Sequence, residues 1–249
     1  MAELTDILEV GSGQGFHAYH LNRRRGNRVV GIDVSAADIK VAQKRYPAVD
    51  FRRMDATKLA FSDASFDGVY ALDVLEHVDD LVSVVCEMVR VLRPAGQLFI
   101  NVPAERSERW LLQLRPTYFS EIHHVRIFRG SELEDLLATH GCRLVKRQPT
   151  GFLQHLELWY LFTRQRSSDS QLSIGNWRRG PVSIAVHLGL LYLDPVVLKT
   201  PLRWLPVWLL TLPLGAGINL VGNRFFPKSI RYEFKKVFPL PEQVQRGVS

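Results

Sequence analysis

A short stretch near the start of the chain combines the residue types of a small-molecule binding site. Glu9 lies two residues before Gly11, and two more glycines follow at alternate positions, Gly13 and Gly15. Glycine lets the backbone approach a ligand closely, and a helix that begins after such a turn offers unpaired N–H groups to polar or anionic atoms. The stretch therefore predicts a strand, a turn and a helix that bind a nucleotide-like ligand. An ordinary strand-to-helix turn is the structural alternative, which the loop by itself leaves open.

The spacing of the glycines narrows the class of ligand that the loop could bind. A dinucleotide fingerprint, G-x-G-x-x-G, would need its third glycine where this chain has Phe16. An acid at Glu9 suits the amine of an amino acid better than a pyrophosphate. The run Val29–Asp33 predicts a second buried strand that ends in a carboxylate about twenty residues after the loop, where doubly wound folds hold ribose hydroxyls.

The glycine stretch resembles the first motif of the class I S-adenosylmethionine-dependent methyltransferases, E/D-x-G-x-G-x-G. Further stretches of the chain resemble later motifs of this family, in the right order. Phe51–Ala56 resembles the third strand, Phe66–His77 the fourth strand and its following turn, and Leu92–Pro103 the helix end and the fifth strand. The resemblance extends over about residues 5–148.

The resemblance implies S-adenosyl-L-methionine as the cofactor. Glu9 would hold its amino acid end, Asp33 its ribose, and Asp55 the adenine amino group, with the Ala56 N–H beside the ring. The expected cofactor-binding residues are Glu9, Gly11, Ser12, Gly13, Gly15, Asp33, Val34, Asp55, Ala56, Leu72 and His77. We predict no metal site, because displacement at a sulfonium needs no metal.

Strands that alternate with helices predict an α/β protein with a parallel sheet. The expected helices are Phe16–Asn22, Ala36–Arg45 and Leu81–Leu92. The resemblance implies a Rossmann-like, doubly wound, seven-stranded sheet whose first five strands are parallel and whose sixth and seventh form a hairpin edge. Cys142–Gln148 fits the sixth strand, and the alternating run Ile230–Phe238 fits the seventh. We therefore predict a core at 1–150, a hydrophobic, basic insertion at 151–229, and a last strand with a tail at 230–249.

Two adjacent histidines are the catalytic candidates. They lie in a stretch that resembles the H-V-R-x-F segment of small-molecule methyltransferases related to the quinone-biosynthesis enzymes. His123 and His124 cannot both face one side of an extended segment, and we favour His124 as the general base. Glu121 and Arg126 are candidates for orienting it. A histidine that only orders its loop is the alternative. His77, in the turn after the fourth strand, is interpreted as packing under the cofactor.

Length and composition limit the number of domains and the cellular compartment that the chain can be expected to have. With 249 residues and 46% apolar side chains, the chain can bury one sizeable core and a smaller appended element. Cys86 and Cys142 offer neither a disulfide framework nor metal-ligand spacing, so we expect two small core residues in a reducing compartment. A capped helix is expected at Ser131–Leu137. No secretory signal precedes the first strand, which predicts the cytoplasm or a cytoplasmic membrane face.

The net charge of +7 is confined to the end of the chain. Residues 1–150 hold 20 basic and 20 acidic side chains, whereas residues 151–249 hold 12 and 5. The same region holds Trp204–Asn223, an uncharged run that is nominally long enough to span a bilayer but contains prolines and glycines. We predict that Pro181–Gly222 is a hairpin lying on or dipping into an anionic membrane surface. A hydrophobic lid on the catalytic domain is the alternative.

These features favour an O-methyltransferase for a lipophilic small molecule or a lipid-linked acceptor, with C-methylation as a variant. A nucleic-acid methyltransferase is disfavoured, because the basic excess accompanies apolar runs and Leu72–Leu75 does not match the N/D-P-P-Y motif of base-methylating enzymes. A non-catalytic, membrane-associated scaffold would not need the intact acidic and glycine positions. The oligomeric state is left open.

Overall fold

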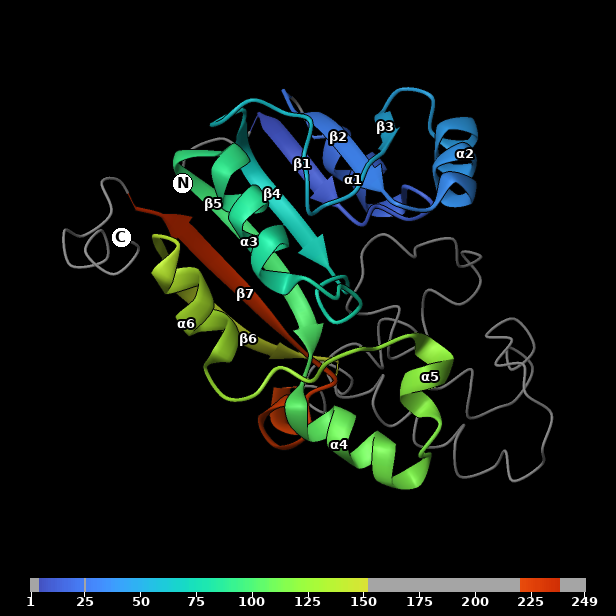
Figure 1. Ribbon diagram of the computed structural model, residues 1–249, viewed down its shortest axis with the longest axis vertical. Helices are drawn as coiled ribbons and strands as arrows, with labels where there is room; N and C mark the ends of the chain where they lie inside the picture. The colour runs from blue at the N-terminus through green and yellow to red at the C-terminus, as the bar shows by residue number, and fades with distance from the viewer. Residues whose placement is uncertain (1–4, 25, 152–219, 238–249) are drawn as a thin grey trace, which may run out of the picture. The chain divides into compact units, whose positions relative to one another are not determined.

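A single sheet organises the described part of the chain. The computed structural model describes residues 5–24, 26–151 and 220–237. The strands are β1 (Asp6–Val10), β2 (Arg28–Asp33), β3 (Asp50–Arg53), β4 (Phe66–Leu72), β5 (Leu92–Pro103), β6 (Cys142–Thr150) and β7 (Ser229–Lys236). They form a seven-stranded sheet in the order β3-β2-β1-β4-β5-β7-β6 (Figure 1). The predicted doubly wound sheet is confirmed.

The first five strands run parallel, and β7 enters between β5 and β6 in the opposite direction (Figure 1). The order reverses beside β1, since β2 and β3 lie on one side of it and β4 and β5 on the other. In open sheets of this kind, ligands bind outside the carboxyl ends of the strands at such a switch point. The glycine loop after β1 lies at this end.

Six helices lie wholly within the described residues. They are α1 (Phe16–Asn22), α2 (Ala36–Arg45), α3 (Leu81–Val91), α4 (Glu105–Leu114), α5 (Tyr118–Ile122) and α6 (Glu132–Thr139). The bounds of α1 and α2 agree with the prediction, and α3 is one residue shorter than predicted. Helix α2 begins after Ser35, whose side chain accepts from the backbone N–H of Asp38. The predicted side-chain cap of α6 is not formed, because the Ser131 hydroxyl donates to Asp135 instead.

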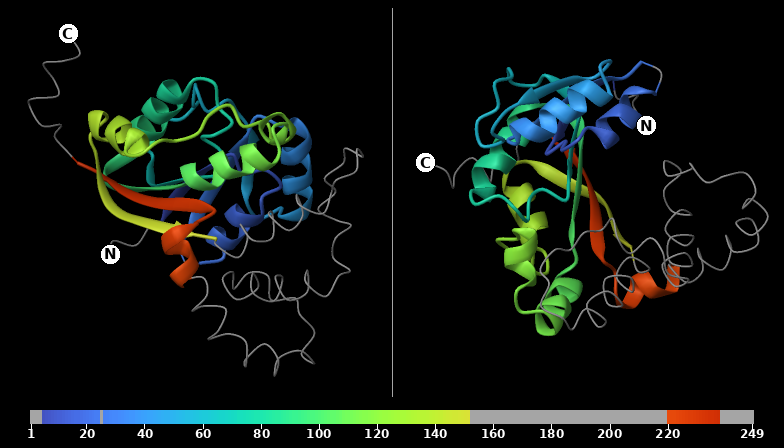
Figure 2. Two further views of the ribbon diagram at one scale, coloured as in Figure 1. Left: turned by 90° about the horizontal axis from the view of Figure 1, so that it is seen from below. Right: turned by 90° about the vertical axis from the view of Figure 1, so that its right-hand side faces the viewer.

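Both faces of the sheet are covered by helices. Ala18 and Leu21 of α1 and Ile39 of α2 belong to one buried cluster with Ile7 and Val29 of the strands. Their periodicity of three to four residues matches one helical face. Figure 2 shows α3 and α6 on the opposite side of the sheet from α1. This layering buries the central strands β1 and β4, whereas the edge strands β3 and β6 are largely exposed.

Several strand boundaries differ from the prediction by a few residues, including the end of β6 at Thr150 and both ends of β7, and the differences in β5 and β3 have a structural cause. Residues 92–96, expected as a helix end, belong to β5, where the pairing with β4 shifts between Phe66 and Gly68 and Ala95 adopts a φ of 62°. Strand β3 ends at Arg53, before the predicted Asp55, because the backbone N–H of Met54 turns to Asp33. Both differences arise from interstrand register, which the local pattern does not specify.

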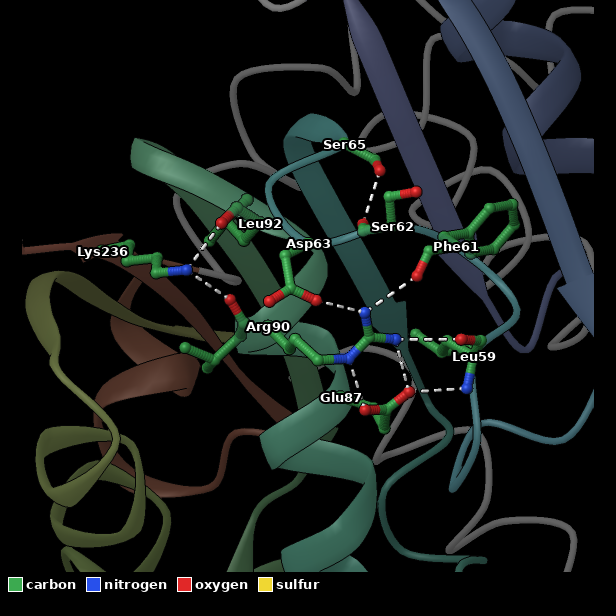
Figure 3. Close-up of polar contacts among 10 residues, drawn as sticks. Leu59, Phe61, Ser62, Asp63, Ser65, Glu87, Arg90, Leu92 and Lys236 are labelled. Atoms are coloured by element: carbon green, nitrogen blue, oxygen red, sulfur yellow. Dashed lines mark hydrogen bonds and ion pairs between the residues drawn. The ribbon is translucent and has the colours of Figure 1, made fainter.

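A guanidinium network fastens α3 to the loop before β4 (Figure 3). Arg90 donates to both carboxylate oxygens of Glu87, to Asp63, and to the carbonyls of Leu59 and Phe61, at 2.7 to 2.9 Å. These charge-assisted bonds raise the pKa of Arg90. The network satisfies loop carbonyls that would otherwise lack partners, so we interpret it as structural.

The chain divides into two compact units. Among the described residues, the second unit comprises 104–122, 149–151 and 220–230, and the first comprises the rest. Within the second unit, Arg106 donates to the Phe225 carbonyl at 2.9 Å and stacks over the Phe226 ring. Residues 220–225 are helical. Most of the predicted insertion, including the hairpin at Pro181–Gly222, lies outside the described residues.

No helix in the described ranges is long and apolar enough to cross a membrane.

Candidate active site

The glycine loop between β1 and α1 combines a backbone that other residues rarely adopt with a lack of space for a side chain. Gly11 has a φ of +69°, and an added Cβ would lie 2.3 Å from Cγ2 of Val74. Gly15 has a φ of +82°, and its added Cβ would lie 2.4 Å from the Phe51 ring. Left-handed backbone and the lack of space both require glycine at these two positions. The turn is closed by the Gly15 N–H, which donates to the Ser12 carbonyl at 2.9 Å.

Glu9 places a buried carboxylate directly before this loop. Its exposed fraction is 4%, and its Oε1 lies 2.8 Å from Nδ1 of His17 on α1. Its Oε2 is buried and has no hydrogen-bond partner among the described residues, and the same holds for the Ser12 hydroxyl. Buried polar atoms are normally satisfied, so these two atoms mark acceptor positions for a ligand. A carboxylate oxygen of this kind suits an ammonium group.

Asp33, at the end of β2, has a loop-forming role as well. Its Oδ2 accepts from the Gly13 N–H at 2.8 Å, and its Oδ1 accepts from the Ser35 N–H at 2.8 Å. A carboxylate has about four acceptor positions, so two remain for ribose hydroxyls. Val34, the next residue, is exposed. The predicted ribose carboxylate therefore also ties the β1 and β2 loops together.

Asp55 and Ala56 lie in the loop after β3. Oδ1 of Asp55 accepts from the backbone N–H and the hydroxyl of Thr57, each at 2.8 Å. These bonds lower the pKa of Asp55, which is exposed. Leu72, the last residue of β4, is partly buried.

The turn after β4 and the segment after α5 are tied together within the first unit. The His77 Nδ1 lies 3.0 Å from the His123 carbonyl, and the Val125 N–H donates to the Glu76 carbonyl at 2.9 Å. Because a carbonyl only accepts, Nδ1 of His77 carries the proton. The rings of His77 and His124 meet edge to face, with centroids 4.8 Å apart. His123 has a φ of 58°, so the chain turns sharply there and the two adjacent histidines do not share one environment.

This pairing brings together the groups that could hold a cation. One ligand atom each from Glu76, His77 and His124 lies within 4.8 Å of the others. Zinc is bound tetrahedrally with bonds of about 2.0–2.2 Å to nitrogen and oxygen, so its ligand atoms would stand about 3.4 Å apart and the cluster would have to contract. Without an ion, the same three groups form a polar cluster under the β4 turn. The absence of a metal site stays a prediction.

The candidates for orienting the base have other partners. Glu121, in the second unit, accepts from Arg115 at 2.9 Å and from the Thr117 hydroxyl at 2.6 Å, and the Thr117 bond lowers the pKa of Glu121. Arg126 donates to the carbonyls of Val78 and Asp79 and so fastens the β4 turn. Neither contact is with a histidine ring, and the catalytic roles of these residues stay predictions.

Sequence reasoning missed two polar residues at this end of the sheet, His17 and Asn101. His17 contacts Glu9, and Asn101 at the end of β5 donates to Oδ1 of Asp73 at 2.7 Å. Asp73 adopts a φ of 54° in the turn after β4. The rule that polar groups at the carboxyl ends of parallel strands converge indicates Asp73 and would also have indicated Asn101. His17 shows no such signal, since its partner lies across the loop.

Comparison with known proteins agrees with this geometry. Residues 8–100 match the family described as a methyltransferase domain. A protein of Mycolicibacterium smegmatis, named as an S-adenosylmethionine-dependent methyltransferase, is 32% identical over 162 residues, which cover 57% of this chain and 63% of that protein. A ubiquinone biosynthesis O-methyltransferase of Hahella chejuensis is 39% identical over 100 residues, 38% of this chain and 42% of the relative.

The fold is shared with solved structures at low sequence identity. A structure from Galdieria sulphuraria, described as a sarcosine dimethylglycine methyltransferase, superposes with a TM-score of 0.58 at 15% identity and covers 94% of this chain and 78% of that one. The matched region spans less than two thirds of the curated relatives named above. Residues 8–100 therefore match a methyltransferase domain, and the chain is similar in sequence over part of its length to S-adenosylmethionine-dependent methyltransferases and shares their fold.

Proposed function

We propose that this chain transfers a methyl group from S-adenosyl-L-methionine to an oxygen of a lipophilic small molecule or a lipid-linked acceptor, at or near a membrane. The observation that carries the transferase part is the glycine loop, where Oε2 of Glu9 and the Ser12 hydroxyl are buried without a hydrogen-bond partner in the described ranges. An amino acid end with an ammonium group complements this pair. Asp33, Asp55 and the Ala56 N–H are assigned to the ribose and adenine.

The proposed reaction is an in-line displacement. The bound cofactor supplies an electrophilic methyl group on a sulfonium; the acceptor oxygen bonds to that carbon, and the electron pair of the broken bond stays on sulfur. His124 accepts the proton of the acceptor hydroxyl, which contributes about 10²–10⁴ to the rate. Holding the reacting atoms in line lowers the reaction barrier by about 7–11 kcal/mol. The loops therefore need only orient the two substrates and exclude water.

The lipophilic acceptor is supported by the edges of the insertion. Leu220, Val221 and Phe225 are exposed in the helical residues 220–225, and Phe226, which follows directly, is exposed as well. Large exposed apolar groups in one short segment are typical of contacts with lipid or another apolar partner. The uncharged run that precedes them in the sequence suits the same partner.

The basic residues that follow the predicted hairpin do not contribute equally to the proposed binding of anionic lipid. Lys236 donates to the carbonyls of Val89 and Leu92 at 2.7 Å, and burial lowers its pKa. The Lys236 ammonium group therefore caps the C-terminal end of α3 and is not available to bind anionic head groups. Lys228, Arg231 and Lys235 are left as candidates, each contributing about 1 kcal/mol if it lies near a lipid surface.

The proposal includes the predicted division into a core at 1–150, an insertion at 151–229, and a last strand with a tail at 230–249. It places the domain on the cytoplasmic face of a membrane. No observation favours a nucleic-acid substrate or a scaffold role, but both are outcomes of the test below.

Calorimetric titration with S-adenosylmethionine, with and without liposomes of anionic lipid, tests the proposal first. We expect micromolar binding that depends little on lipid, followed by labelling of a lipid-extract fraction when methyl-labelled cofactor is supplied. Absence of binding in both conditions would favour a scaffold, whereas labelling of nucleic acid alone would favour the alternative enzyme.

Sedimentation with the same liposomes tests the membrane part. The full chain should pellet, and a variant lacking Pro181–Gly222 should stay in the supernatant and still bind cofactor. An Arg52→Ala variant of the exposed β3 surface is the control for a general loss of positive charge, and it should pellet like the wild type. Aggregation of the deletion variant would show instead that the segment is part of the core.

A further inference from the structure

His17 is joined to the buried acid of the glycine loop by a contact that the methyl-transfer chemistry does not itself require. Its Nδ1 lies 2.8 Å from Oε1 of Glu9, while Oε2 of Glu9 has no hydrogen-bond partner among the described residues. An ionised carboxylate only accepts, so Nδ1 donates in this pair. The contact therefore orients one oxygen and leaves the other for a ligand.

The position of the His17 ring is itself well supported. Glu9 and Tyr70 are register partners on β1 and β4, and the Tyr70 ring stacks on Phe99 of β5, with centroids 4.5 Å apart. The His17 ring packs against Tyr70 with centroids 5.4 Å apart. Three adjacent strands and α1 thus hold the donor against Glu9. Side chains held by packing lose less freedom when a ligand binds.

We propose that His17 is a positioning residue that orients Glu9 to bind the ammonium group of the cofactor. This inference rests on the proposed function, because it concerns the amino acid end of the same cofactor. Loss of the His17 donor leaves both carboxylate oxygens without a protein partner in the described ranges. Glu9 can then rotate, or turn Oε2 away from the ligand, and the site loses its selectivity for the amine.

Two ligands that differ only in the amine isolate this role. S-adenosyl-L-homocysteine and its des-amino analogue share the adenosine, the thioether and the carboxylate. Calorimetry gives the Kd of each ligand for the purified full chain. The Kd of the des-amino analogue divided by the Kd of S-adenosyl-L-homocysteine measures selectivity for the amine. Because both ligands bind the same folded molecules, the ratio does not depend on how much of a variant is folded.

Three variants separate positioning from packing. His17→Phe keeps a ring against Tyr70 and removes the donor, so the ratio should fall about tenfold. In His17→Asn, the side-chain nitrogen replaces Nδ1, and most of the ratio should be restored. His20→Phe is the matched control on the same helix, where the native ring packs on Phe16 and Tyr19, and it should leave the ratio unchanged.

The outcomes distinguish the inference from the proposed function. If His17→Phe weakens both ligands equally, or changes neither, His17 is only structural and the inference is overturned while the proposed function stands. If His17→Asn behaves like His17→Phe, the donor is not the active feature and the inference is again overturned. If the wild type binds neither ligand, the proposed function fails and the inference fails with it.

Discussion

The carboxylates at the two ends of the parallel strands differ in how completely they are satisfied. At the starting end, Asp67 of β4 accepts from the Thr5 hydroxyl at 2.7 Å, from the Asp6 N–H at 3.0 Å and from Arg93 at 2.7 Å. At the carboxyl end, Glu9 of β1 has one contact, with His17, and a buried oxygen without a partner in the described part of the chain.

This difference separates stability from binding. Burial works to raise the pKa of Asp67, but the Asp6 N–H, Arg93 and Thr5 outweigh it and hold the pKa well below its ordinary value. A carboxylate saturated in this way stabilises the folded chain. An acceptor left open inside a protein is destabilising unless a ligand fills it. Asp67 therefore acts within the fold, whereas Glu9 keeps an open acceptor that the proposed function assigns to the cofactor.

The substitution Glu9→Gln should have the largest effect, on cofactor binding. Loss of the charge facing the ammonium group should weaken S-adenosylmethionine binding about 100-fold, or about 3 kcal/mol. The free energy of unfolding should change by less than about 1 kcal/mol, because a neutral amide is less costly to bury. Calorimetry and urea unfolding measure the two quantities. Unchanged affinity with a large loss of stability would place Glu9 with the structural carboxylates.

The substitution Asp67→Asn should give the reciprocal result. An amide cannot accept from Arg93, the Asp6 N–H and Thr5 together, so urea unfolding should show a loss on the order of 2 kcal/mol. Cofactor affinity should be preserved, which makes this variant the matched control for Glu9→Gln. Weakened cofactor binding in a folded Asp67→Asn protein would contradict the separation of the two ends.

The substitution Asp33→Asn should have effects on stability and on cofactor binding that lie between those of Glu9→Gln and Asp67→Asn. Its carboxylate accepts from the N–H groups of Gly13 and Ser35 and is also assigned to the ribose. We expect a loss of about 1 kcal/mol in unfolding free energy together with about tenfold weaker cofactor binding. Calorimetry and denaturant titration on the same sample would show both effects. A change in the unfolding free energy alone would mark Asp33 as a structural carboxylate, and a change in affinity alone would mark it as a binding carboxylate.

Acidification should sharpen the comparison further. The folded-state pKa of Asp67 lies below its ordinary value of 3.8, so its stabilisation is complete above that value and is lost as the pH falls through the folded pKa. The wild type should therefore lose stability more steeply than Asp67→Asn below about pH 4. Urea midpoints measured between pH 3 and pH 6 test this, and parallel curves would contradict it.

Removal of metal ions should have the smallest effect. Since methyl transfer from a sulfonium needs no Lewis acid, treatment with a chelator should leave the methylation rate unchanged. The cluster of Glu76, His77 and His124 makes the test informative. A loss of rate that zinc restores in the wild type, but not in a His77→Ala variant, would identify this cluster as a metal site.

Much of the fold could be predicted from the sequence because its signals are local. The glycine loop before Phe16 and the proline Pro47 indicated helices at Phe16–Asn22 and Ala36–Arg45 with the observed bounds. The last strand was predicted within two residues at its start and end, since Tyr232 and Phe234 alternate with charged residues and are buried. Helices α4 and α5 were not predicted, because their sequences lack a continuous apolar period.

The candidate site could be predicted only in its glycine loop and acidic positions. The contact of His77 with His123 joins residues 46 positions apart, and Asn101 meets Asp73 across 28 positions. No local pattern specifies such pairs, because they depend on which strand ends lie side by side. The same holds for the bulge in β5, which interstrand register determines.

By itself, the sequence determined the strand, turn and helix that make the cofactor loop, because left-handed backbone at Gly11 and Gly15 requires glycine. It also determined which strand ends carry an acid. Only the tertiary structure decided which of those acids is saturated and which is open. Asp67 and Glu9 lie on neighbouring strands, yet they differ because Thr5 and Arg93 reach Asp67 from distant parts of the chain, whereas the Glu9 carboxylate has a polar contact only with the nearby His17 among the described residues.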